Sequence, residues 1–121
     1  MRPVEMERPT IKVFVKPDHG RLETLRQLMY GIEEEGIPYE VTEENYHDAV
    51  SLAWEASQQS RLGVGLGLDH DTLVLQFSKL KENEPLFQIS ARSPEVDVRA
   101  MGANAARLVK KLPFKKLWED R

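Results

Sequence analysis

The order of the first three elements limits the possible folds of this chain more than any other feature of its sequence. The segment TIKVFVK (10–16) alternates β-branched residues with polar or aromatic ones, which is the two-residue period of a strand. Between about residues 21 and 35 the apolar residues recur every three or four positions, as in an amphipathic helix, and Gly36 is suited to its left-handed end. PYEVT (38–42) has the character of a second strand. This order predicts a β-α-β unit with parallel strands.

The rest of the chain continues to alternate between helices and strands. The expected elements are a helix at about 45–60 capped by Thr42 or Asn45, two strands at 62–68 and 72–77 that form an antiparallel hairpin, a last strand at 86–91, and a last helix from about Ser93 to Leu112. This order favours a three-layer α/β/α domain with helices on both faces of a five-stranded mixed sheet. The sheet is expected to be mostly parallel, with one antiparallel strand.

The length of 121 residues suits one compact domain. Residues 1–9 contain Pro3 and Pro9 and are expected to form a flexible N-terminal arm, followed by a single domain at 10–121. No stretch approaches the roughly 20 apolar residues that span a bilayer, and the N-terminus lacks the apolar run of a signal peptide. We therefore expect a soluble protein with no membrane partner.

Composition excludes several functional classes. The chain has no cysteine, which rules out disulfides, thiolate zinc sites, iron-sulfur clusters and a cysteine nucleophile, and favours the reducing cytoplasm. Its 17 basic and 20 acidic residues give a net charge of -3, unlike the basic surface of general nucleic-acid binders. This average hides a contrast, because residues 107–121 carry six Lys or Arg against two Asp or Glu, a net +4 that leaves -7 for the remainder. No nucleic-acid partner is expected.

Two short motifs suggest chemistry, but each has a simpler explanation. Asp69, His70 and Asp71 bunch three potential metal ligands at a hairpin turn, although a solvated turn is the more common outcome. GVGLG (63–67) contains the glycines of a nucleotide-binding loop, but it lies in a strand and does not open a helix. Its alternating glycines instead let a helix, or another chain, approach the sheet closely. No serine sits on a nucleophile elbow, so a catalytic triad is not supported.

Three consecutive carboxylates, Glu33, Glu34 and Glu35, lie in the last turn of the first predicted helix. The negative end of the helix dipole disfavours acidic side chains there by roughly 0.3 kcal/mol each, so another group should compensate. Successive helical residues point about 100° apart, so the three cannot chelate one ion alone. One of them could still supply a single oxygen to a hard cation such as Mg²⁺ or Ca²⁺. A solvated acidic face is the alternative.

The C-terminal segment PFKKLW places Phe114, Leu117 and Trp118 in a basic context. Such a patch either docks on its own domain or anchors a partner, because tryptophan and arginine are favoured at protein interfaces. Nucleic acid is a third and weaker alternative for this segment.

Three longer strings resemble one known family: GIEEEGIPY (31–39), AWEASQQSRLGVGLGLD (53–69) and GANAARLVKKLPF (102–114). They are similar to the small subunit of the diol and glycerol dehydratase reactivating factor, and the resemblance extends over about residues 11–118. One departure is visible, because the family usually has an asparagine where Ala103 stands. This departure affects any polar contact at that position but not the family assignment.

The resemblance implies a fold like that of the dehydratase medium subunit, of the anticodon-binding-domain-like type, in a subunit with no catalytic site. The expected partner is a large actin-like ATPase subunit that carries ATP or ADP, with two copies of each subunit in the complex. The expected client is an adenosylcobalamin-dependent dehydratase that has been inactivated during turnover. In the mechanism that the resemblance implies, exchange of the small subunit for the dehydratase medium subunit opens the client and releases its damaged cobalamin.

The resemblance also implies a role for one residue of the triplet. Glu34 is expected to contribute to a divalent metal, Mg²⁺ or Ca²⁺, shared with the ATPase subunit. The flanking acids Glu33 and Glu35 and the apolar residues Phe114 and Trp118 of the C-terminal segment are the residues we expect at the partner interface.

Two other functions stay open. A dehydratase medium subunit would itself help to hold cobalamin, but such subunits usually carry a longer N-terminal part than the roughly ten residues that precede the first strand here. A small metal- or nucleotide-binding domain working alone would rest on the motifs at 63–71. The choice between a glycerol and a propanediol dehydratase as client stays open, as does location inside a bacterial microcompartment.

Overall fold

The computed structural model describes residues 8–117 and contains all the predicted elements in the predicted order. They are β1 (Ile11–Val15), α1 (Leu22–Glu34), β2 (Tyr39–Glu43), α2 (Ala49–Gln59), β3 (Val64–Leu68), β4 (Thr72–Phe77), β5 (Phe87–Ser90) and α3 (Glu95–Lys110). Strand β4 has the predicted bounds, and the other elements differ by a few residues at their ends. Within residues 8–117, no helix is long and apolar enough to cross a membrane.

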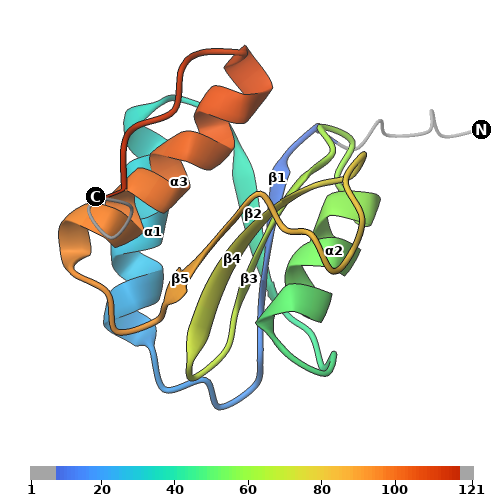
Figure 1. The fold of residues 1–121 in the computed structure, drawn as a ribbon, viewed down its shortest axis with the longest axis vertical. Coiled ribbons are helices and arrows are strands. Elements are labelled where there is room, and N and C mark those ends of the chain that lie inside the picture. The colour runs from blue at the N-terminus through green and yellow to red at the C-terminus, as the bar shows by residue number, and fades with distance from the viewer. Residues whose placement is uncertain (1–7, 118–121) are drawn as a thin grey trace, which may run out of the picture.

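The five strands form one mixed sheet in the order β2-β1-β3-β4-β5. Strand β1 pairs in parallel with β2 and β3, whereas β4 pairs antiparallel with both β3 and β5. Strand β4 is therefore the one strand that runs against the others, as predicted. Helices α1 and α3 cover one face of the sheet and α2 covers the other, so the domain has three layers (Figure 1).

Strand β1 is buried on both faces because it lies at the centre of the parallel part of the sheet. Ile11 and Val13 belong to the main core with α1 and α3, and Phe14 packs against α2. Lys12 also points to the α2 side and is nearly buried, but its ammonium reaches Glu40, its register partner on β2, at 2.5 Å. The alternating sequence pattern therefore does not mark a solvent-exposed face here, since a central strand has a helix on each side.

Helix α2 packs directly on the glycines of β3. A Cβ atom at Gly65 would lie 2.2 Å from the Ser57 amide nitrogen, and one at Gly67 would lie 2.2 Å from the Ala49 carbonyl oxygen. The chain's own helix therefore explains the alternating glycines. The predicted start of α2 is wrong: the helix begins at Ala49, and the side chain of Asp48 caps it by accepting from the Ser51 amide at 2.9 Å. Neither Thr42 nor Asn45 lies at the cap.

Helices α1 and α3 run side by side in the same direction and touch through two glycines. A Cβ atom at Gly31 would lie 2.1 Å from the Arg99 carbonyl oxygen, and one at Gly102 would lie 2.2 Å from the Leu28 carbonyl oxygen. This close approach fixes the register between the two helices. It brings the basic side of α3 next to the acidic end of α1.

Candidate functional site

The candidate site is the acidic triplet (Glu33, Glu34, Glu35) at the C-terminal end of α1. Helix α1 has no basic residue in its last turn, and it ends where Gly36 takes a left-handed conformation, with φ of 77°, as predicted. The compensation that the helix dipole requires comes mainly from α3, whose basic side chains reach the triplet. Each of the three carboxylates has a different set of partners.

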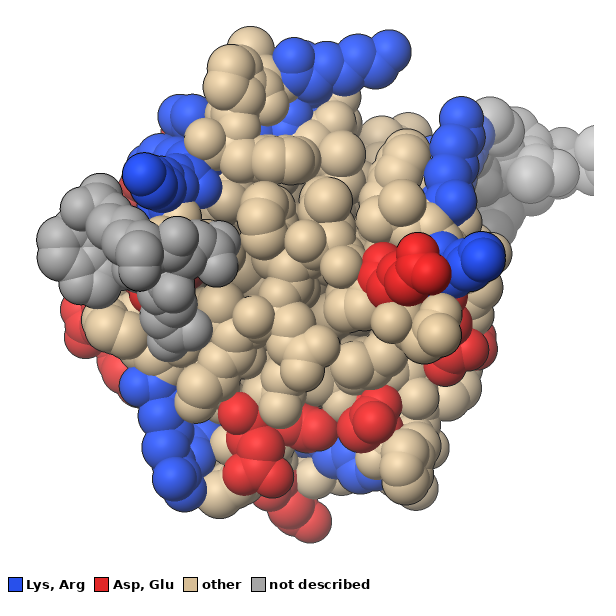
Figure 2. Space-filling model, viewed as in Figure 1, with Lys and Arg blue, Asp and Glu red and all other residues tan. Residues whose placement is uncertain are grey.

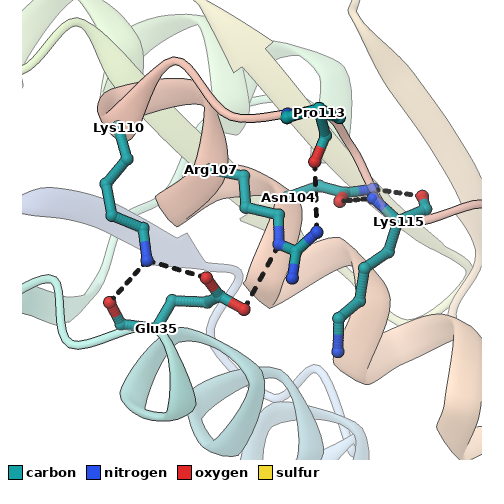
Figure 3. Close-up of polar contacts among 6 residues, drawn as sticks. All are labelled: Glu35, Asn104, Arg107, Lys110, Pro113 and Lys115. Atoms are coloured by element: carbon teal, nitrogen blue, oxygen red, sulfur yellow. Dashed lines mark hydrogen bonds and ion pairs between the residues drawn. The ribbon is translucent and has the colours of Figure 1, made fainter.

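Glu35 is held by two cations of α3. The Lys110 ammonium lies 2.7 Å from one carboxylate oxygen of Glu35 and also donates to its backbone carbonyl at 2.9 Å, and the Arg107 Nε lies 3.3 Å from the other oxygen (Figure 3). The Glu35 side chain is only 12% exposed. The hydrogen bond from Lys110, and then that from Arg107, holds the pKa of the Glu35 carboxyl below its ordinary value against the opposing effect of burial. Its carboxylate thus ties α1 to α3.

Glu33 faces the start of β2 instead. Its carboxylate accepts a hydrogen bond of 3.2 Å from the Tyr39 hydroxyl. Burial, and then the nearby charge of Glu33, raises the pKa of Tyr39. An open hollow of about 400 Å³ lies beside this pair and is lined by Arg8, Glu33, Gly36, Ile37, Pro38 and Tyr39.

Glu34 is the most weakly held of the three. Its one ion pair, among the residues described, is with the Arg99 Nη1 at 3.5 Å, the outer limit of a hydrogen bond. Both side chains are about half exposed, at 49% for Glu34 and 45% for Arg99. The Glu34 carboxylate is therefore available to a cation that approaches from outside the chain.

The triplet fits a shared metal site and not a self-contained one. Residues 8–117 contain no group of three or more His, Cys, Asp or Glu side chains placed to hold a metal ion. Glu34 alone offers one or two oxygens, whereas Mg²⁺ and Ca²⁺ need six or more ligands, so a partner and water would have to supply the others.

In the Asp69–Asp71 turn, the Asp69 carboxylate is already hydrogen-bonded to backbone amides of this chain. One oxygen of Asp69 accepts from the amides of Asp71 and Thr72, at 2.9 and 2.8 Å, and the other accepts from the Ala49 amide at 3.0 Å. The carboxylate thus closes the hairpin and joins it to the start of α2. The plainer interpretation of this turn agrees with these contacts.

The segment after α3 docks on its own domain as far as the structure describes it. The buried Asn104 side chain pairs with both backbone groups of Lys115, at 3.0 and 2.6 Å, and Arg107 donates to the Pro113 carbonyl at 3.1 Å (Figure 3). Phe114 meets the Phe87 ring edge to face at 5.2 Å and stays 39% exposed. Trp118 lies outside the described residues.

Sequence reasoning missed the role of Asn104. The signal was a polar residue beside the apolar stripe of the last helix, where it is fully buried and must find hydrogen-bond partners. Its partners are backbone groups eleven positions away, which a helical pattern does not show.

One side of the molecule offers a largely uncharged surface. In Figure 2, uncharged residues form the middle of the viewed face, and the Lys, Arg, Asp and Glu side chains lie around its rim. An uncharged centre within a polar rim is the usual arrangement of a protein–protein interface.

The sequence matches one family along nearly the whole chain. The model of the dehydratase medium subunit family covers residues 8–115. The chain belongs to the dehydratase medium subunit family. This assignment agrees with the resemblance found in the sequence.

Curated members of this family that match the chain are small subunits of reactivating factors. The propanediol dehydratase-reactivating factor small subunit of Salmonella typhimurium is 40% identical over 109 residues, which cover 90% of this chain and 92% of that protein. The protein of the same description from Citrobacter freundii is 37% identical over 107 residues, covering 88% of this chain and 90% of that protein.

Two solved structures share the fold of this family member. A chain of diol dehydratase-reactivating factor, complexed with ADP and Mg²⁺, superposes with a TM-score of 0.84 and 35% identity, covering 91% of this chain and 100% of that one. A chain of glycerol dehydratase reactivase gives a TM-score of 0.87 and 30% identity, covering 90% and 98%. The predicted α/β fold with its five-stranded mixed sheet is thereby confirmed.

Proposed function

We propose that this chain is the non-catalytic small subunit of an ATP-dependent reactivating factor for an adenosylcobalamin-dependent diol or glycerol dehydratase. The observation that carries the proposal is the match to reactivating factor small subunits over about nine-tenths of both chains. The alternative, a medium subunit of the dehydratase itself, is disfavoured because these relatives are reactivating factor subunits. The chain would work in the bacterial cytoplasm, either free or inside a microcompartment.

The proposed mechanism is an exchange of subunits. The large subunit binds and hydrolyses ATP, and two large and two small subunits form the resting complex. Because the small subunit shares the medium-subunit fold, the large subunit can release it and take the medium subunit of an inactivated dehydratase in its place. The client then opens, the damaged cobalamin leaves, and intact cofactor binds after the original pairs have re-formed.

The proposed contact with the large subunit is centred on the end of α1. Glu34 would supply one oxygen to a Mg²⁺ or Ca²⁺ ion whose other ligands come from the large subunit and water, and the ion would neutralise carboxylates on both sides. Glu33 and Phe114, both partly open to solvent, are proposed to lie in the same interface, together with Trp118. Glu35 would act there through its cluster with Lys110 and Arg107, since its carboxylate is already used.

Co-purification with the large subunit tests the proposal. The pair is expected to restore turnover to a dehydratase inactivated by glycerol when ATP and Mg²⁺ are present, and neither subunit should do so alone. Spectroscopic titration with cobalamin separates the alternative. Tight cobalamin binding by this chain, together with the other dehydratase subunits, would show that it is a medium subunit.

A further inference from the structure

Arg99 is anchored independently of the acid that it contacts. Its Nε donates to the Gln27 side-chain oxygen at 2.7 Å, and its guanidinium lies over the Tyr30 ring, 5.5 Å from the centroid. Gln27 is nearly buried, and the Arg99 backbone packs against Gly31. These contacts keep the guanidinium in place whether or not Glu34 remains beside it.

We propose that Arg99 is a built-in competitor of the divalent cation for the Glu34 carboxylate. This inference rests on the proposed function, in which Glu34 contributes to a metal shared with the large subunit. In the free chain, the fixed guanidinium neutralises Glu34. On assembly, the carboxylate turns from Arg99 to the metal. Arg99 therefore raises the concentration of the divalent cation that is required for association with the large subunit.

The geometry of the pair suits an exchange. A contact of 3.5 Å between two half-exposed groups belongs to the weakest class of ion pairs, which a divalent cation can displace. Because Arg99 keeps Gln27 and Tyr30, losing Glu34 does not leave its charge without neighbours. A glutamate side chain has three rotatable bonds and can reorient while α1 stays in place.

The other two acids lack this combination. Glu35 is bound by both Lys110 and Arg107 and is mostly covered, so its release would break both ion pairs that join the end of α1 to α3. Glu33 contacts a neutral hydroxyl, which offers no competing charge. Among the three, Glu34 alone pairs with one fixed cation and still faces solvent.

The test measures association with the large subunit across a Mg²⁺ titration, by surface plasmon resonance with the large subunit immobilised. Arg99→Gln removes the charge and keeps an amide that can bond with Gln27. We expect the half-saturating Mg²⁺ concentration to fall by up to about fivefold, the range of one exposed ion pair. Arg99→Lys keeps a charge and should stay closer to the wild type. Arg99→Met is a second neutral variant if Arg99→Gln does not fold.

Arg26→Gln is the matched control. Arg26 is an exposed arginine of α1 paired with Glu23, and it lies two helical turns from Glu34, roughly 12 Å at 1.5 Å per residue. At that separation its charge is screened by physiological salt, so this variant should leave the Mg²⁺ requirement unchanged. Circular dichroism of every variant verifies the fold.

The outcomes separate this inference from the proposed function. If Glu34→Gln removes the Mg²⁺ dependence and Arg99→Gln lowers the requirement, both stand. An unchanged or increased requirement in Arg99→Gln, with Glu34→Gln still abolishing the Mg²⁺ effect, would overturn the competition alone. Unchanged Mg²⁺ dependence in Glu34→Gln would remove the metal role of Glu34 and the inference with it.

Discussion

Asn104 and Glu35 show how single buried polar groups join segments that are distant in the sequence. Asn104 uses its amide nitrogen and its oxygen to hold the two backbone groups of Lys115. Glu35 binds side chains 72 and 75 positions further along the chain. In both cases the polar group is satisfied through tertiary structure, so its removal affects the docking of a segment and not only one bond.

Replacing Asn104 with alanine should destabilise the docked C-terminal segment. The variant leaves the Lys115 amide and carbonyl without their side-chain partner, which costs about 1–3 kcal/mol of unfolding free energy. Urea denaturation followed by circular dichroism measures the loss. Lys115→Ala is the control, because Asn104 contacts only the backbone of this residue. Equal stability of Asn104→Ala and the wild type would show that water replaces the amide at no cost.

The Glu35 cluster should make stability depend on pH. Because the pKa of the folded Glu35 carboxyl lies below its ordinary value of 4.5, its ionisation stabilises the fold above about pH 4.5, and this contribution is lost as the pH falls through the folded pKa. Glu35→Gln should therefore be less stable than the wild type at pH 7, by about 1 kcal/mol. The difference should shrink in urea titrations run at progressively lower pH.

Glu34→Gln is the comparison for this pH series. The Glu34 carboxylate has one long contact with Arg99, so its replacement should change the unfolding free energy little. A pH-independent difference between Glu35→Gln and the wild type would contradict the stabilising role assigned to the ionised carboxylate.

At the scale of elements, the tight crossing of α1 and α3 determines which side chains meet at the candidate site. Gly31 and Gly102 bring the two backbones together, and the register that follows places Arg99 beside Glu34 and Lys110 beside Glu35. The backbone packing of the two helices therefore determines which side chains lie next to one another at the site.

Gly31→Ala should destabilise the protein, although a glycine-to-alanine substitution inside a helix usually stabilises it. In an ordinary helix interior this substitution stabilises by about 1 kcal/mol. Here the new Cβ would lie 2.1 Å from the Arg99 carbonyl oxygen, so the helices must separate, and we expect a loss of about 1–3 kcal/mol. Thermal and urea unfolding measure the sign. A more stable variant would show that α1 and α3 adjust without strain.

Local patterns predicted the elements well because each strand and helix shows its own period in the sequence. They placed the left-handed end of α1 at Gly36 and related the glycines of β3 to close packing. They do not show contacts whose deciding partner is remote: Lys12 is covered because β1 lies centrally, and the group that compensates Glu35 comes from α3. The start of α2 was missed because Asp48, a good cap, follows several other polar residues that fit the same role.

At the scale of the whole molecule, the function proposed here depends on two proteins with one fold competing for one partner. The family to which the chain belongs is that of the dehydratase medium subunit, whereas the individual proteins that it matches are reactivating factor small subunits. If both bind the same face of the large subunit, their binding must be mutually exclusive. A ternary complex would require separate faces and would rule out exchange.

This competition can be followed with a single fluorescent label. The chain has no cysteine, so Asn83→Cys introduces one reactive thiol on the exposed loop between β4 and β5, at a residue outside α1 and the segment after α3. Added dehydratase medium subunit should displace the labelled chain from the large subunit and lower the fluorescence anisotropy to that of the free chain. The unlabelled chain should do the same and calibrates full displacement. An anisotropy that rises on addition of the medium subunit would reveal a ternary complex, and subunit exchange would then fail as the mechanism even if reactivation itself were observed.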